Sequence, residues 1–121
     1  MTYCLEFSIQ GLPLMTNGIR GHWAKTAREA RYWRSLSAWS AREHKRPTAP
    51  LTRALVTLTR HSSAEPDFDG LVSAMKPILD GLVDAGVIAN DKPSCIAQPK
   101  YSWIKAKRGQ GRITVKVEGA E

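Results

Sequence analysis

The stretch PDFDGLVSAMKPILDGLVDAG, residues 66–86, decides the fold of this chain. Its apolar residues recur every three or four positions, which is the period of one face of an α-helix, and Gly86 stands where a C-terminal cap belongs. Because Pro77 removes a backbone donor and clashes with the preceding turn, we expect a kink or a break near residues 73–77, with two short helices as an alternative to one. The apolar positions are Phe68, Leu71, Val72, Met75, Ile78, Leu79, Leu82 and Val83.

Alternating apolar and polar residues on both sides of this stretch predict strands, and a run without Gly or Pro predicts a further helix. The order strand, helix, strand, helix, strand, strand is typical of a small single α/β (α+β) domain over residues 1–121, with a mixed sheet of about four strands and two main helices. The order of the strands within the sheet stays open. The predicted elements are strands at about 3–10, 51–60, 96–104 and 112–118, a helix at about 22–44, and a basic hairpin connection at 107–111.

The chain has 121 residues, with 18 Lys and Arg against 11 Asp and Glu, and a net charge of +7. Such a surplus attracts polyanions, so nucleic acid is the first partner to expect, with a merely soluble basic protein as the alternative. We find no signal-like segment and no apolar run of about 18 residues, which predicts a cytoplasmic protein without a membrane partner. Cys4 and Cys95 belong to no metal or redox motif, and we interpret both as buried thiols in a reducing compartment.

Carboxylates gather at the start of the predicted helix and after its end. Asp67 and Asp69 flank one apolar residue, and such a pair suits a hard divalent cation such as Mg²⁺; the alternative is that they only cap the helix and favour its dipole. Lys76 and Asp80 lie on a polar stripe, where a solvated i, i+4 ion pair is the simpler interpretation. Asp91 lies in a segment that ordinary turn chemistry also explains. The stripe consists of Asp69, Ser73, Lys76, Asp80 and Asp84.

Taken in order, these signals resemble the RusA family of Holliday-junction resolvases. That family has an Asp-x-Asp ahead of a helix that carries a Lys, then an Asp-x-Leu, a small-residue stretch ending in Gly-Val, and an acidic pair before the next strand. This chain departs from the pattern in having Gly70 where many members have Asn, a Lys one turn later than usual, and a single acid in the last pair. The matching segments are Asp67-Phe68-Asp69, Lys76, Asp80-Gly81-Leu82, Asp84-Ala85-Gly86-Val87 and Asn90-Asp91, with a weaker likeness at Ile9, Pro13, Asn17, His22 and Trp23.

The resemblance implies a Mg²⁺-dependent endodeoxyribonuclease, with Mn²⁺ as an alternative ion, that cuts branched DNA and above all four-way (Holliday) junctions by paired phosphodiester hydrolysis. It implies Asp67, Asp69 and Asp91 as metal ligands and catalytic residues, and Lys76 as a catalytic cation beside the phosphate. Two cuts need two active sites, so it also implies a homodimer acting in recombination, repair or phage DNA processing. The alternatives are a non-enzymatic basic nucleic-acid-binding module and a junction-binding family member with weak catalysis.

The predicted first helix and its flanks carry eight Lys or Arg against two Glu. A row of cations with few counter-ions favours contact with DNA phosphates, and a solvated helix face is the alternative. The aromatic residues Trp23, Tyr32, Trp33 and Trp39 recur at helical spacing, so we interpret them as core or interface residues and do not assign them to DNA. The expected DNA contacts are Arg20, Lys25, Arg28, Arg31, Arg34 and, in a second basic group, Lys100.

Overall fold

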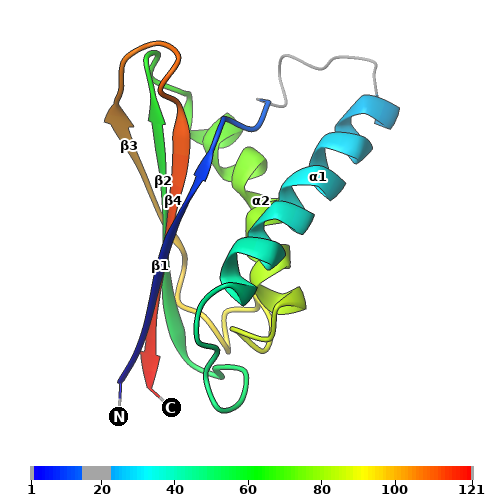
Figure 1. The fold of residues 1–121 in the computed structure, drawn as a ribbon, viewed down its shortest axis with the longest axis vertical. Coiled ribbons are helices and arrows are strands. Elements are labelled where there is room, and N and C mark those ends of the chain that lie inside the picture. The colour runs from blue at the N-terminus through cyan, green and yellow to red at the C-terminus, as the bar shows by residue number, and fades with distance from the viewer. Residues whose placement is uncertain (1, 15–22, 121) are drawn as a thin grey trace.

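The computed structural model describes residues 2–14 and 23–120, in which a four-stranded sheet carries two helices on one face (Figure 1). The elements follow one another in the order that the sequence pattern predicts, so the expected α+β class is confirmed. No helix in this part of the chain is long and apolar enough to cross a membrane. The elements are β1 (Thr2–Gln10), α1 (Trp23–Arg42), β2 (Ala54–Ser62), α2 (Phe68–Asp84), β3 (Lys100–Lys105) and β4 (Arg112–Ala120).

The strand that comes last along the chain lies inside the sheet. The strand order is β1-β4-β2-β3, with β4 antiparallel to both of its neighbours and β3 parallel to β2. The expected hairpin at 107–111 is therefore wrong, because the two strands that this segment joins are not paired with each other. Parallel pairing of β2 with β3 needs a long crossover connection, which includes α2. Gly and basic residues at 107–111 indicate a chain reversal but do not select the neighbour of the returning strand.

Alternation of side chains gives the sheet one buried and one more exposed face. In β1 every second residue is buried, and the register aligns Leu5 of β1 with Val117 of β4 and Val56 of β2 in the core. Cys4 lies on the other face and is exposed, so its interpretation as a buried thiol is wrong. The reason is the period of two, which turns Cys4 away from the side of Leu5. Cys95 is buried, as expected.

α2 continues through Pro77 without a break, so the two short helices given as an alternative are wrong. Proline in a helix interior costs about 3 kcal/mol. Met75, Ile78 and Leu82 are fully buried in the core, and each such side chain contributes about 1.5–3 kcal/mol. The carbonyl oxygen of Ile78 also accepts a hydrogen bond from Oγ of Ser37 in α1, at 2.8 Å. Packing therefore outweighs the missing backbone donor.

α1 and α2 approach so closely that only Gly fits at one point of contact. A Cβ at Gly81 would lie 2.5 Å from the carbonyl oxygen of Arg34 and 2.6 Å from Cβ of Ser37. Near the end of α2, Nε of Arg34 also pairs with Oδ2 of Asp84 at 2.6 Å. These contacts fix one face of α1 against α2 and leave the opposite face of α1 to solvent.

Two strands begin later than the alternating pattern predicts. Leu51 forms an isolated bridge with Ile88, and β2 begins only at Ala54. Ile96 forms a second isolated bridge, with Ala54, and β3 begins at Lys100. Leu51 and Ile96 are both buried, so they belong to the core although they lie outside the strands. Apolar alternation therefore detects burial correctly and places the start of these two strands too early.

Candidate functional site

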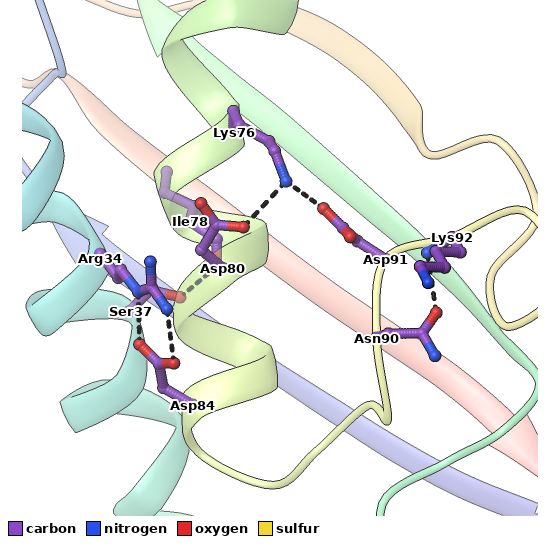
Figure 2. A network of polar contacts seen from close by, with 9 residues as sticks. All are labelled: Arg34, Ser37, Lys76, Ile78, Asp80, Asp84, Asn90, Asp91 and Lys92. Carbon is purple, nitrogen blue, oxygen red and sulfur yellow. Dashed lines mark hydrogen bonds and ion pairs between the residues drawn. The ribbon is translucent and has the colours of Figure 1, made fainter.

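Lys76 lies at the centre of an ion-pair network on α2 (Figure 2). Its Nζ donates to Oδ1 of Asp80, one turn further along the helix, at 2.9 Å. It also donates to Oδ2 of Asp91, which comes from the loop after α2 and is 15 residues away in the sequence. Two separate sequence signals, the polar helix stripe and the acid in the turn, thus meet at one cation.

The ion pair between Lys76 and Asp91 favours the charged form of both groups. The hydrogen bond from Lys76 lowers the pKa of Asp91, and the hydrogen bonds to Asp91 and Asp80 raise the pKa of Lys76. The side chain of Lys76 is 55% exposed and that of Asp91 is 29% exposed. Water therefore screens the pair, and the ammonium group of Lys76 remains accessible to an anion from solution.

Asp91 reaches Lys76 because a turn presents it. Oδ1 of Asn90 accepts a hydrogen bond from the backbone N–H of Lys92 at 2.9 Å, as in an Asx turn. The interpretation of this segment as a turn is therefore confirmed for its backbone. The turn leaves the carboxylate of Asp91 facing α2, where it contacts Lys76 (Figure 2).

Asp67 and Asp69 stand at the N-terminus of α2. The backbone of Asp67 is extended (φ −73°, ψ 154°), and its Oδ2 accepts a hydrogen bond from the N–H of Gly70 at 3.3 Å. The capping alternative is therefore confirmed for Asp67. Asp69 lies in the first turn of the helix, where the helix dipole favours a carboxylate. Both residues are exposed, and the cap engages one oxygen of Asp67.

Asp69 and Lys76 lie on the same face of α2, about two turns apart. Their separation of seven residues corresponds to roughly 10 Å along the helix axis. Asp91 contacts Lys76 and therefore lies on the side of α2 that carries Asp69. In the described part of the chain no three His, Cys, Asp or Glu side chains form a group that could hold a metal ion. The structure thus brings Asp91 to Lys76 and Asp80, and it does not bring Asp67 and Asp69 to the same point.

Tyr101 of β3 contacts Phe68 at the start of α2 and is also close to Lys76 and Asp91. The sequence pattern did not indicate it as a site residue. Its ring packs edge-on against the ring of Phe68, with centroids 6.3 Å apart and planes at 86°. Burial raises the pKa of Tyr101, and the charges of Lys76 and Asp91 are close enough to act on it too. The alternation at 96–104 predicts a strand, but the parallel pairing with β2 that sets the position of Tyr101 has no local sequence signal.

The carboxylates around α2 are the candidate ligands for a hard divalent cation. Mg²⁺ is commonly bound through one or two carboxylates, with water and phosphate oxygens completing its coordination. Asp67 and Asp69 are exposed and two positions apart, so they are the residues that could hold such an ion. Asp80 and Asp91 form a second pair, whose negative charge Lys76 offsets. We refer to these five residues as the α2 site.

The cations expected to bind DNA differ in how they are engaged. Arg34 binds Asp84 through two hydrogen bonds of 2.6 and 2.9 Å, which raise the pKa of Arg34 and lower that of Asp84. Arg20 lies outside the described residues. Among the cations expected to bind DNA, the exposed ones that form no ion pair within the described part of the chain are Lys25, Arg28 and Arg31 on α1 and Lys100 at the start of β3.

The aromatic residues of α1 divide between the core and the surface. Trp33 is 3% exposed, and its Nε1 donates to Oε1 of Glu29 at 3.0 Å, so its interpretation as a core residue is confirmed. Tyr32 and Trp39 are 59% and 68% exposed. They therefore do not belong to the core, because they lie on the face of α1 that is turned away from α2, and the interface interpretation stays a prediction for both. The side chain of Trp23 lies outside the described residues.

Comparison with protein-family models gives no match for this chain, and comparison with curated proteins gives none either.

Proposed function

We propose that this protein is a metal-dependent endodeoxyribonuclease that cuts branched DNA, with four-way junctions as its main substrate. The observation that supports this most directly is the contact between Lys76 and Asp91. It places the acid after α2 on the side of the helix that also carries Asp69, although Asp91 contacts Lys76 and not the carboxylates of Asp67 and Asp69. The surplus of positive charge on the chain fits a polyanionic substrate.

In this proposal each residue of the α2 site has a defined task. Asp67 and Asp69 would hold Mg²⁺ or Mn²⁺, with Asp91 as a third, inner or water-mediated, ligand. The bound ion would supply a water of lowered pKa and stabilise negative charge on the phosphate. Lys76 is more than half exposed, so its ammonium group can donate to a phosphate oxygen while Asp80 keeps it oriented.

The proposed reaction also has consequences for the oligomeric state, the DNA contacts and the cellular process. Symmetric cutting of a junction requires two copies of the α2 site, so we propose a homodimer. Lys25, Arg28, Arg31 and Lys100 would bind phosphates outside the cleavage point, and Arg34 would do so only at the expense of its pairing with Asp84. A role in recombination, repair or phage DNA processing in the cytoplasm follows from the substrate.

A second candidate function is a nucleic-acid-binding module without catalysis. It is favoured by the structural tasks that the key side chains already have, because Asp67 caps α2 and Lys76 is held between two carboxylates. A junction-binding protein with weak catalysis lies between the two candidates. Binding data alone therefore cannot distinguish them, and cleavage must be measured.

The test is cleavage of a labelled four-way junction and of a matched duplex, each with Mg²⁺, Mn²⁺ or EDTA. Wild type is expected to give metal-dependent paired nicks in the junction only, and Asp69→Asn to lower the rate about 100-fold. Glu118→Gln removes the same charge from an exposed position on β4 and should cut at the wild-type rate. Tight junction binding without nicks in any metal indicates a weak family member, and equal binding of junction and duplex without nicks indicates the module.

A further inference from the structure

One face of α1 carries an unbroken exposed row of basic, aromatic and small polar side chains. Its members are spaced by three, four, three, four and three residues, which is the period of a single helix face. Each of them is exposed, and the face lies opposite to the one that packs on α2, except at its C-terminal end, where Nη2 of Arg42 donates to the carbonyl oxygen of Asp84 at 3.1 Å. We call it the α1 stripe, and it consists of Lys25, Arg28, Tyr32, Ser35, Trp39 and Arg42.

The two aromatic rings of the α1 stripe are unusually open to solvent. Trp39 is 68% exposed and Tyr32 is 59% exposed, although such rings normally bury most of their surface. The ring of Tyr32 meets that of Trp33 edge to face, with centroids 5.8 Å apart and planes at 89°. Because Trp33 is itself fixed in the core, this contact restrains the orientation of Tyr32.

The spacing of the two rings fits a strand of stacked bases. Tyr32 and Trp39 are seven residues apart, which is roughly 10 Å along the helix. Successive stacked nucleotides in a strand are about 3.4 Å apart, so the same distance spans about three base steps. Exposed aromatic rings interleaved with cations are the usual platform for unpaired nucleic acid, since bases stack on the rings and phosphates contact the cations.

The charge of the α1 stripe indicates which kind of partner it can bind. Lys25, Arg28 and neighbouring Arg31 form no ion pair within the described part of the chain, and the α1 stripe itself contains no acid. A second copy of this helix would bring cations against cations, which is unfavourable. The phosphates of a nucleic acid strand complement them.

We propose that the α1 stripe binds an unpaired DNA strand, with bases stacked on Tyr32 and Trp39 and phosphates on Lys25 and Arg28, and on Arg31 beside the stripe. This rests on the proposed action on DNA but not on hydrolysis, because the stripe lies on a different helix from the α2 site. The stripe supplies a preference for unpaired bases, which a surface of cations alone does not have.

The test compares strands that have the same phosphates and differ in their bases. Affinities of a labelled oligothymidine, an abasic strand of equal length and a duplex are measured in EDTA at one salt concentration. Trp39→Ala should weaken oligothymidine binding about tenfold, because stacking of one base is worth about 5- to 150-fold in affinity, and should leave abasic-strand and duplex binding unchanged. Trp39→Phe should restore most of the loss. Leu55→Ala removes an exposed apolar side chain from the sheet and should change nothing.

The other outcomes overturn the proposal. If Trp39→Ala weakens binding of oligothymidine and of the abasic strand equally, or weakens neither, the rings do not bind bases. A shift of Trp39→Ala from dimer to monomer in sedimentation assigns the face to a second copy of the chain. Tighter binding of an oligouridine RNA than of oligothymidine, lost in the same variant, assigns it to RNA. Absence of junction cleavage with normal strand binding contradicts the nuclease proposal alone.

Discussion

At the scale of single residues, Lys76 is the point where distant parts of the chain meet. It binds Asp80 within its own helix and Asp91 from the loop beyond it. Without Lys76, the two carboxylates would face each other with no cation between them. The pair of Lys76 with Asp91 can be detected through the pH dependence of stability, since one partner titrates in acid and the other in alkali.

Replacing Asp91 by Asn should make the free energy of unfolding depend less on pH in the acid range. The hydrogen bond from Lys76 lowers the pKa of Asp91 from its ordinary value of 3.8. The pair therefore stabilises the folded protein above about pH 4, and this contribution is lost as the pH falls through the lower folded pKa. Because the pair is partly exposed, we expect the loss to be about 0.5 kcal/mol. Urea unfolding of wild type and Asp91→Asn at a series of acid pH values measures it.

Two comparisons make this measurement specific. Glu65→Gln removes an exposed carboxylate close to α2. Its free energy of unfolding should depend on pH as that of wild type does. In alkali the sign is reversed, because the pKa of Lys76 is raised above 10.5; its contribution is complete below that value and disappears as the pH rises through the folded pKa. Identical profiles for wild type and Asp91→Asn would rule out the ion pair in solution.

Asp67 caps α2 and, in the proposed function, also holds the metal ion, and substitution can separate the two roles. Asp67→Ala removes the acceptor for the N–H of Gly70 and should lower the free energy of unfolding by about 1 kcal/mol. Asp67→Asn keeps an acceptor oxygen, so its stability without metal should equal that of wild type. The Asn variant should nevertheless gain less stability from Mg²⁺, because it has lost an anionic ligand. Thermal melts with and without Mg²⁺ measure both effects, and an Ala variant as stable as wild type would contradict the cap.

The parts of the α2 site that can be predicted from sequence are those that depend on spacing alone. The cap at Asp67 and the pair of Lys76 with Asp80 follow from distances of three and four residues within one helix. The contact of Asp91 with Lys76 depends on the path of a loop, and only the resemblance pointed to Asp91. Tyr101 could not be predicted, since its position follows from the order of the strands.

At the scale of elements, the crossing of α1 and α2 depends on the missing side chain of Gly81. Gly81→Ala improves helix propensity by roughly 1 kcal/mol. Its new Cβ would nevertheless lie 2.5 Å from the carbonyl oxygen of Arg34, which belongs to the rigid backbone of α1. We expect a net destabilisation of about 1–3 kcal/mol, measured by chemical denaturation.

Ser73→Ala is the matched control for this experiment. Ser73 is exposed on the same helix, so the added propensity should not be opposed by a clash and stability should rise slightly. If Gly81→Ala were as stable as wild type, the helices would have room to separate and the close contact would not be needed for folding.

The types of the elements could be predicted more completely than their connections. Alternating and helical patterns depend on which side chains face the core, and the core here is continuous from the sheet to both helices. Pro77 shows the limit of local rules, since burial of Met75 and Ile78 outweighs its helix-breaking tendency. The position of β4 between β1 and β2 depends on contacts between residues about 50 to 120 positions apart, for which the sequence pattern carries no signal.

At the scale of the whole molecule, the cations of α1 should determine how DNA binding depends on salt. Each phosphate contact contributes about 0.9 to the slope of log affinity against log salt concentration. Arg28→Ala and Arg31→Ala should each reduce the slope by about that amount, for duplex and junction alike, because phosphates carry no sequence or branch identity. Affinities measured by anisotropy over a range of NaCl concentrations give the slopes.

Arg53→Ala is the control for charge in general. Arg53 is exposed just before β2, and its removal lowers the net charge by the same amount. Its slope should equal that of wild type. If all three variants reduce the slope equally, binding depends on net charge alone, and α1 is only a solvated face.

The central position of β4 also has a consequence for biosynthesis. β1 leaves the ribosome long before β4, its partner in the sheet, which is translated about a hundred codons later, with Leu5 facing Val117. Until then the nascent polypeptide contains the apolar strands β1 and β2 without β4, the strand that lies between them in the sheet. We therefore expect folding to follow translation of β4, and a polypeptide stalled before residue 112 to remain sensitive to proteases and dependent on chaperones.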